Sequence, residues 1–167
     1  HFRKVAQKLK EAGSLDPKLV KIPGIYVDAV VIGAPEDNTQ CISMEYDGAA
    51  AGEFTIPLDA IPTIPLNQRK VVARRAAMEL VPNAIVNLGI GMPEGVASVA
   101  AEEGLQGMVL TTESGTIGGI PAGGKDFGVT TNPECILDEP YQFDFYDGGG
   151  LDVAFLGLAQ MDRAGNI

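Results

Sequence analysis

The feature that most constrains this chain is a carboxylate between a short β-branched, apolar run and a glycine-rich stretch. Residues 108–112 (Met-Val-Leu-Thr-Thr) are typical of a buried parallel strand, and Glu113 follows them directly. Five glycines lie in the ten residues from Gly115 to Gly124, so the backbone after the acid can approach a ligand closely. Open α/β sheets bind ligands at the carboxyl ends of their strands, which favours a functional Glu113. The spacing is equally compatible with a turn that Glu113 caps and in which the glycines merely make tight bends.

A second strand with glycines at its end precedes this one. Residues 84–88 form an apolar strand candidate, and Gly89 and Gly91 form the turn into a predicted helix. Free N–H groups in such a turn can bind an anion or a developing oxyanion, helped by the helix N-terminus. The pattern nearly matches the dinucleotide fingerprint G-x-G-x-x-G, but Glu94 stands where the third glycine is required. A nucleotide-binding domain, with Glu113 on a ribose hydroxyl, is therefore an alternative interpretation.

Composition disfavours several classes of function. A formal net charge of −10 argues against nucleic acid or an anionic membrane as a partner. The sequence has no run of 18 apolar residues and no signal-peptide pattern, so a cytoplasmic location is predicted. His1 is the only histidine, and Cys41 and Cys135 lie far apart, so neither a zinc site nor a histidine-activated nucleophile is expected. The acidic residues near the C-terminus lack EF-hand spacing, and no metal is predicted.

Periodicity and capping signals predict the remaining elements. An amphipathic helix is expected over residues 2–9, and Asn67 is a good N-cap for a helix over 68–80. The basic residues of the second helix are Arg69, Lys70, Arg74 and Arg75. They are expected to form a solvated face rather than an anion site. The other expected elements are a strand over 25–32, a linker region over 34–66, a helix over 96–103, a short helix through residue 137 capped by Asn132, a strand or ordered loop over 141–146, a strand over 152–159 and a hairpin turn over 162–166.

Together these elements predict an α/β fold with an open, mainly parallel sheet and flanking helices. Residues 1–66 are interpreted as the end of one half followed by a linker, and residues 67–167 as the start of the domain that contains Glu113. The first predicted helix has no cap residue before it, and no returning strand follows the last predicted turn. Truncation at both ends is therefore expected.

Four stretches of the sequence resemble, in the same order, motifs of the family I CoA-transferases, especially the single-chain acetate/propionate (short-chain acyl) type. These stretches are Lys21–Asp28 (KIPGIYVD), Val86–Pro93 (VNLGIGMP), Glu113–Gly124 (ESGTIGGIPAGG) and Phe143–Asp152 (FDFYDGGGLD). The resemblance covers nearly the whole chain. It implies the CoA-transferase-like (NagB/RpiA-like) variety of the α/β class.

The resemblance also implies a chemistry, in which Glu113 is the catalytic nucleophile and forms a glutamyl-CoA thioester. The residues implied to bind substrate or CoA are Asn87, Gly89, Gly91, Gly118 and Gly119. Asn87 is expected either to orient the substrate or only to hold its turn. CoA is then a substrate, with no permanently bound cofactor and no metal. The implied partners are acyl-CoA, short-chain carboxylic acids, the remainder of the parent chain and a second copy in a homo-oligomer. A CoA-ester hydrolase of the same fold and a partner-binding fragment without activity are the alternatives.

Overall fold

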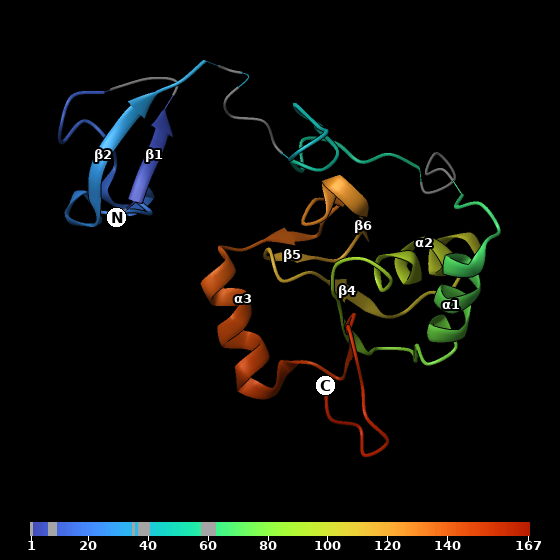
Figure 1. Cartoon of the computed structure of the whole chain (residues 1–167). Coiled ribbons are helices and arrows are strands. Elements are labelled where there is room, and N and C mark those ends of the chain that lie inside the picture. The colour runs from blue at the N-terminus through green and yellow to red at the C-terminus, as the bar shows by residue number, and fades with distance from the viewer. Residues whose placement is uncertain (1, 7–9, 35, 37–40, 58–62) are drawn as a thin grey trace. The chain divides into compact units, whose positions relative to one another are not determined.

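The computed structural model describes residues 2–6, 10–34, 36, 41–57 and 63–167. The chain forms two compact units: His1–Gln40 with Met44–Tyr46, and Cys41–Ser43 with Asp47–Ile167 (Figure 1). All the elements around Glu113 belong to the second unit. The assignment of residues 1–66 to a preceding half and linker stays a prediction.

The first unit is built on two parallel strands, β1 (Phe2–Ala6) and β2 (Val27–Ile32). The helix predicted over residues 2–9 is therefore wrong over 2–6, and residues 7–9 lie outside the described part of the chain. Apolar spacing over so short a run fits either element, and pairing with the β-branched β2 selects the strand.

The strand predicted over residues 25–32 is confirmed from Val27 onward. Its first two residues instead belong to a 3-10 turn, η2 (Gly24–Tyr26). A second 3-10 turn, η1 (Pro17–Leu19), begins where the Asp16 carboxylate accepts a hydrogen bond from the Lys18 N–H at 2.9 Å.

The second unit contains a five-stranded sheet in the order β8-β5-β4-β3-β9. Its strands are β3 (Ile85–Leu88), β4 (Val109–Thr111), β5 (Thr116–Ile117), β8 (Cys135–Ile136) and β9 (Val153–Phe155). Strand β3 is parallel to its neighbours β4 and β9, whereas β5 is antiparallel to β4 and β8. A separate antiparallel pair joins β6 (Ile120–Pro121) to β7 (Thr130–Thr131). The predicted α/β fold with a mainly parallel sheet is confirmed, with antiparallel strands added on one side.

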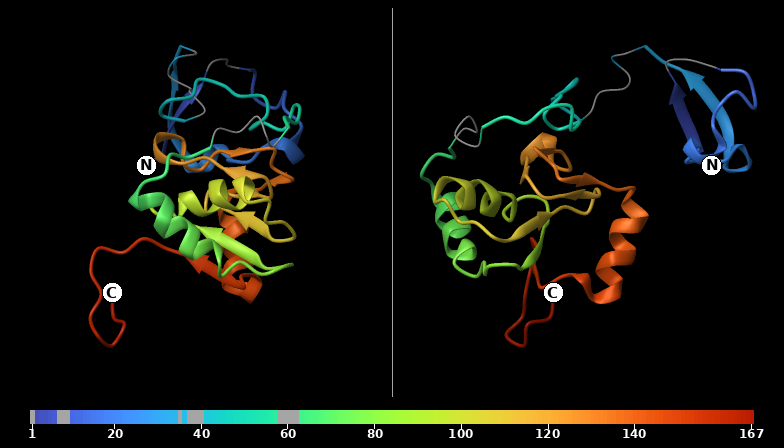
Figure 2. Two further views of the ribbon diagram at one scale, coloured as in Figure 1. Left: turned by 90° about the vertical axis from the view of Figure 1, so that its right-hand side faces the viewer. Right: turned by 180° about the vertical axis from the view of Figure 1, so that it is seen from behind.

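The two faces of this sheet differ in chemistry. Val86, Leu88 and Leu110 point into the apolar core, which α2 (Glu94–Glu102) covers. Asn87 and Thr111 are paired in register and alternate with these residues, so they point to the opposite face. Helix α3 (Glu139–Phe145) lies on that side, and Figures 1 and 2 show it across the sheet from α1 and α2.

Helix α1 (Gln68–Ala77) confirms the helix predicted to follow Asn67, whose side chain accepts a hydrogen bond from the Lys70 N–H at 3.1 Å. The helix ends three residues before the predicted Leu80, in the tight turn that precedes Pro82. Small side chains let α1 and α2 approach closely: a Cβ on Gly95 would lie 3.0 Å from that of Ala73. This close packing buries the apolar stripe between them.

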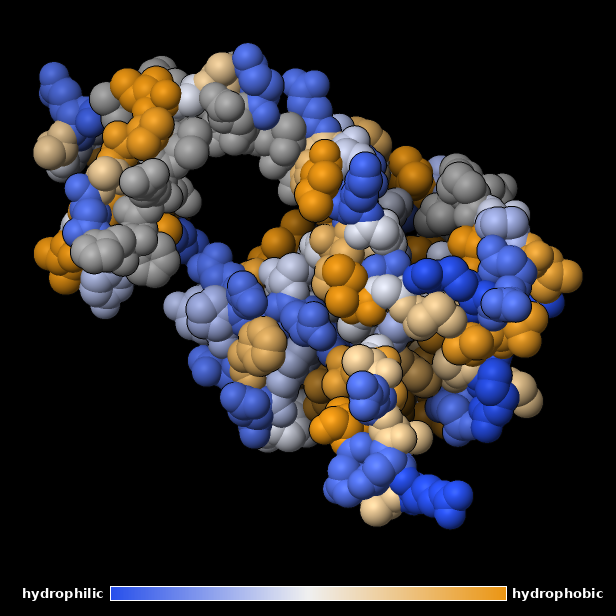
Figure 3. Space-filling model, in the orientation of Figure 1, coloured by the Kyte–Doolittle hydropathy of each residue, from blue (hydrophilic) through white to orange (hydrophobic). Residues whose placement is uncertain are grey.

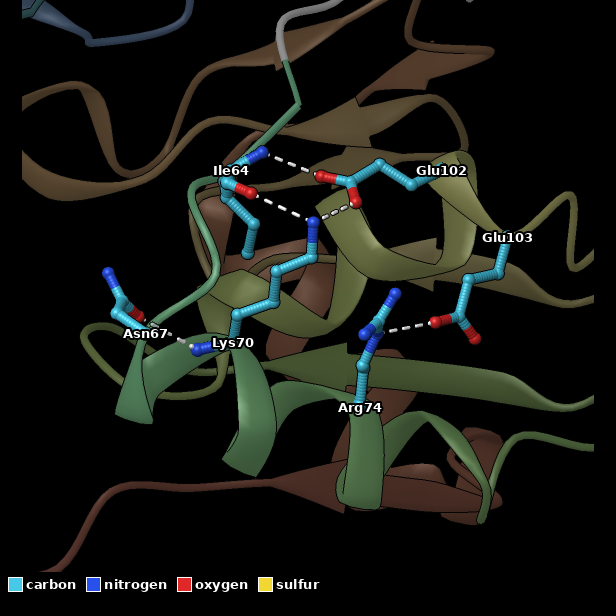
Figure 4. A network of polar contacts seen from close by, with 6 residues as sticks. All are labelled: Ile64, Asn67, Lys70, Arg74, Glu102 and Glu103. Carbon is cyan, nitrogen blue, oxygen red and sulfur yellow. Dashed lines mark hydrogen bonds and ion pairs between the residues drawn. The ribbon is translucent and has the colours of Figure 1, made fainter.

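The solvated face predicted for the basic residues of α1 is confirmed for Arg69, Arg74 and Arg75, which are exposed, but not for Lys70. Lys70 is only 8% exposed, and its ammonium donates to the Ile64 carbonyl at 2.8 Å and to the Glu102 carboxylate (Figure 4). The same carboxylate accepts the Ile64 N–H at 2.6 Å. Arg74 pairs with Glu103 and Arg75 with Glu79, both at more exposed positions. The prediction was wrong for Lys70 because its partners come from segments that only folding brings together.

The short helix predicted after Asn132 is wrong. Asn132 has a φ of 55°, and its side chain bonds both the N–H and the carbonyl of Ile56, at 2.9 and 2.8 Å. Strand β8 follows it instead of a helix. The Asn-Pro pattern of a helix start is thus used here to attach an extended segment.

The strand or ordered loop predicted over residues 141–146 is also wrong, because these residues belong to α3 and the turn that follows it. Asp138 and Pro140 stand at the start of α3, a favourable helix N-terminus that the alternation of aromatic and polar residues obscures. A π-helical turn, η6 (Tyr146–Gly150), closes the helix. Strand β9 is shorter than the predicted 152–159. The hairpin turn predicted over 162–166 is confirmed as a turn, in which the Asp162 carboxylate accepts the Ala164 and Asn166 N–H groups, but no strand flanks it in the described part of the chain.

Candidate active site

Glu113 lies where the sequence predicts, just beyond the carboxyl end of β4. Its side chain is partly buried, and its Oε1 accepts a hydrogen bond from Nδ2 of Asn87, on β3, at 3.3 Å. Gly89 follows β3, and a Cβ placed on it would lie 3.7 Å from the same Oε1. Asn87, Gly89 and Glu113 are thus brought together at the ends of two parallel strands, the usual place for a ligand site in this fold class.

The turn that carries Glu113 is tightly constrained. The Thr112 N–H donates to the Thr116 carbonyl at 3.1 Å, and the Gly115 N–H donates back to the Thr112 carbonyl at 3.1 Å. Gly115 has a φ of 103°, and a Cβ there would lie 2.1 Å from the Leu137 carbonyl oxygen. Only glycine fits this position, so the backbone conformation beside Glu113 has little freedom.

A row of hydrogen-bonded hydroxyl groups stabilises the same turn. Thr112 contacts Ser114 at 2.8 Å and Thr116 at 2.6 Å, and Thr116 contacts Thr130 at 2.6 Å. Thr112 and Thr130 are completely buried. Buried hydroxyls require partners, and these satisfy one another, which fixes the turn on the β7 side.

Tyr146 joins the site from η6, and the sequence analysis did not identify it. Its hydroxyl lies 3.2 Å from Asn87 Oδ1 and 2.7 Å from Thr111 Oγ1, and it accepts the Gln142 Nε2–H at 2.7 Å. Burial raises the pKa of the Tyr146 phenol; the hydrogen bonds to Thr111 and Gln142 oppose this shift and the charge of Glu113 reinforces it. The phenol is therefore a neutral donor at ordinary pH. The i, i+4 spacing of Gln142 and Tyr146 was the available signal, readable only once α3 is recognised as a helix.

The N–H groups of the β3–α2 turn are engaged within the chain. The Gly89 N–H donates to the Phe155 carbonyl at 2.9 Å, and the Gly91 N–H donates to Glu94 Oε1 at 2.7 Å. The other oxygen of Glu94 accepts the Gly124 N–H at 2.9 Å. The Glu94 carboxylate thus ties the two glycine-rich loops together, and Gly123 permits its approach, since a Cβ there would lie 2.8 Å from Glu94 Oε2.

This arrangement disfavours the nucleotide-binding alternative. In the dinucleotide fingerprint, the turn N–H groups bind a pyrophosphate at the helix N-terminus. Here a carboxylate of the chain itself takes the Gly91 N–H at the start of α2. A phosphate would have to displace Glu94 and would meet its negative charge.

Gly118 and Gly119 make the turn between β5 and β6. Both have positive φ, 73° and 68°. An added Cβ would collide with the Glu134 side chain at Gly118, and with the Thr131 and Asn132 carbonyls at Gly119. Their close neighbours therefore lie at the end of β7 and in the segment between β7 and β8, and a role for the two glycines in binding CoA stays a prediction.

Among the described residues, no group of three or more His, Cys, Asp or Glu side chains is placed to hold a metal ion. Neither Cys41 nor Cys135 forms a disulfide bond, and Cys41 donates its thiol hydrogen to Asp126 at 2.8 Å. Within the same part of the chain, no helix has the length and apolar character needed to span a membrane.

The fold and the site define an α/β ligand-binding domain whose candidate reactive group is a single carboxylate. Comparison with known proteins narrows this class. The caffeate CoA-transferase of Acetobacterium woodii is 52% identical over 158 residues, which cover 92% of the chain and 30% of that relative. The acetate CoA-transferase YdiF of Escherichia coli K12 is 45% identical over 167 residues, or 96% of the chain and 30% of the relative.

A solved structure of a CoA-transferase also resembles this chain. The crystal structure of the acyl-CoA transferase YdiF from Escherichia coli O157:H7, a thioester complex with CoA, matches with a TM-score of 0.75 and 41% identity, over 99% of this chain and 30% of that one. No protein-family model matches the chain. The chain belongs to the CoA-transferase family and spans about 30% of the length of these relatives.

Proposed function

We propose that this segment carries the catalytic glutamate of an enzyme that transfers CoA between a short-chain acyl-CoA and a carboxylic acid. The observation that carries the proposal is the placement of Glu113: a partly buried carboxylate, 3.3 Å from an amide donor, at the carboxyl ends of two parallel strands and followed by a glycine turn. The names of the relatives support the same activity.

Such a transfer exchanges one thioester for another, so it needs no ATP. Its difficulty is kinetic, because carboxylates are poor nucleophiles towards thioesters, and covalent catalysis divides the barrier. A carboxylate attacks without first losing a proton, so this nucleophile needs no histidine as a base.

In the first half-reaction, Glu113 attacks the acyl carbon of acyl-CoA and the C–S bond breaks. This step gives an acyl-glutamyl anhydride and CoA thiolate. The thiolate then attacks the glutamyl carbonyl carbon, the anhydride C–O bond on that side breaks, and the donor acid leaves as a carboxylate. Glu113 is left as a glutamyl-CoA thioester. The acceptor carboxylate reverses these two steps, which releases the new acyl-CoA and restores Glu113.

The residues around Glu113 have defined tasks in this scheme. Asn87 binds Oε1, so we assign the attack to Oε2. Gly89 lies beside the carboxylate, and a Cβ on it would meet Oε1 at an ordinary contact distance of 3.7 Å but would crowd the Leu156 side chain at 3.1 Å. We also retain the Gly89 and Gly91 N–H groups as proposed oxyanion donors, which would have to exchange their present acceptors, the Phe155 carbonyl and Glu94, for the developing charge.

The wider context is also proposed. The donor and acceptor acids are short-chain acids such as the acetate in the names of relatives, the location is cytoplasmic, and no permanent cofactor is used. The segment works within a longer polypeptide and a homo-oligomer. Apolar side chains on its surface support this assembly (Figure 3), since contiguous exposed apolar area is usually covered by protein. Exposed apolar residues of the second unit include Val71, Val72, Met78, Ile90, Leu156, Leu158 and Met161.

The hydrolase alternative uses the same thioester, with water in place of the acceptor acid. It predicts free acid and CoA from acyl-CoA alone, whereas a transferase requires a second carboxylic acid. The relatives are named transferases, which favours the second outcome. Measuring CoA release from acetyl-CoA with and without an added acid separates the two activities.

Trapping the covalent intermediate tests the proposal. The full-length protein is incubated with acetyl-CoA and then borohydride, which reduces a glutamyl thioester to an alcohol. The peptide that contains Glu113 is expected to lose about 14 mass units, and Glu113→Gln is expected to show neither the loss nor CoA exchange. If the wild-type protein is active but its Glu113 peptide stays unmodified under these conditions, Glu113 is excluded as the nucleophile.

A further inference from the structure

We propose that Tyr146 is a positioning residue for Glu113 and acts on it through the side-chain amide of Asn87. This inference rests on the proposed function of Glu113 as the nucleophile. Tyr146 is connected to Glu113 through Asn87. The Tyr146 hydroxyl lies 3.2 Å from Asn87 Oδ1, and Asn87 Nδ2 lies 3.3 Å from Glu113 Oε1. Strand β3 contributes the amide, and the turn after α3 contributes the phenol.

The directions of the hydrogen bonds determine how the Asn87 amide is oriented. The Thr111 hydroxyl donates to the Val86 carbonyl at 3.0 Å, so its oxygen accepts from Tyr146. Gln142 donates to the phenol oxygen, so the single Tyr146 proton is shared between Thr111 and Asn87 Oδ1. With Oδ1 facing a donor, Nδ2 faces Glu113; the opposite orientation would set an amide oxygen against a carboxylate oxygen.

A buried amide on α3 supports the phenol in turn. Gln142 is completely buried, and within the described residues its Oε1 is a buried side-chain oxygen with no hydrogen-bond partner. An apolar side chain of similar size would fill the same space without leaving a carbonyl unsatisfied. The role of this glutamine is therefore the bond that its Nε2 donates to Tyr146 at 2.7 Å.

The ring of Tyr146 is packed independently of its hydroxyl. The Phe143 ring lies edge-on to it with centroids 5.8 Å apart, and the Phe145 ring lies 6.2 Å away. Tyr146→Phe keeps these aromatic contacts and removes only the hydroxyl. Tyr141, an exposed tyrosine on α3, provides the matched control.

The experiment measures CoA exchange in the full-length protein carrying Tyr146→Phe, Tyr141→Phe, Asn87→Ala, or both Tyr146→Phe and Asn87→Ala. Tyr146→Phe is expected to lower kcat about tenfold and to change KM for acyl-CoA less than about twofold, because orientation rather than binding is lost. Tyr141→Phe is expected to behave as wild type. Since Tyr146 acts through Asn87, Tyr146→Phe is expected to have no further effect on kcat once Asn87 is alanine.

Gln142→Leu provides a second variant that separates positioning from folding. It is expected to lower kcat about threefold while the melting temperature stays equal or rises, because the unsatisfied carbonyl is removed. An unchanged kcat in Tyr146→Phe, or an equal fall in the wild-type and Asn87→Ala backgrounds, would overturn the positioning role. Wild-type protein without CoA exchange would instead refute the proposed function, so the two failures are distinguishable.

Discussion

Replacing Lys70 with methionine tests how the second unit holds the segment before α1. The Lys70 ammonium is shared between the Ile64 carbonyl and the Glu102 carboxylate, and the two charged side chains are only 10% and 13% exposed. Methionine keeps most of the apolar stem, so the packing of the chain is nearly unchanged. It leaves the Glu102 carboxylate in a largely dry place with the Ile64 N–H as its remaining bond.

The size of the effect follows from this burial. Removing one partner of a buried ion pair costs about 3 kcal/mol or more, because the other charge stays desolvated without compensation. Arg75→Met is the matched control: the Arg75–Glu79 pair is an i, i+4 pair with side chains 67% and 58% exposed, and such pairs contribute about 0.5 kcal/mol or less. Lys70→Met with Glu102→Leu should recover most of the stability, since no unpaired charge remains.

The assay is urea unfolding of the full-length protein and its variants at several pH values. The Lys70 ammonium holds the pKa of the Glu102 carboxyl below its ordinary value of 4.5 in the folded state. Such a group stabilises the fold fully above its unfolded pKa and loses this contribution as the pH falls through its folded pKa. The difference in free energy of unfolding between wild type and Lys70→Met should therefore be largest near neutral pH and shrink below pH 4.5. Equal losses for Lys70→Met and Arg75→Met, or a difference that does not change with pH, would refute the role of the buried pair.

Substitutions at two further positions test the loops around Glu113. Gly115→Ala should destabilise the protein by about 2–4 kcal/mol and abolish thioester formation at Glu113, since its Cβ would lie 2.1 Å from the Leu137 oxygen at a φ of 103°. A folded variant in which borohydride still traps the Glu113 thioester as in wild type would contradict the rigid turn. Glu94→Ala should lower the free energy of unfolding by about 1–3 kcal/mol and speed amide hydrogen exchange at Gly124, whose N–H donates to Glu94. Glu94→Gln, which keeps one acceptor oxygen, should show a smaller change, and unchanged protection of Gly124 in both variants would show that the two loops are tied by other contacts.

The segments predicted correctly from sequence are those in which local signals agree. Asn67 caps α1 as expected, and the apolar, β-branched runs that end at Leu88 and Thr112 form β3 and β4. Where local signals compete, tertiary pairing decides. The N-terminal segment becomes β1 because β2 lies beside it, and Asn132 binds Ile56 rather than capping a helix.

The sequence by itself determined that a carboxylate would stand at the end of a buried strand and before a glycine-rich turn. This information is local: the strand pattern, Glu113 and Gly115 are neighbours along the chain. Only the tertiary structure decided what surrounds that carboxylate. Asn87 and Tyr146 are 59 residues apart, and the Lys70–Glu102 pair joins residues 32 apart. Contacts over such separations depend on which helix covers which face of the sheet, and no local periodicity encodes that choice.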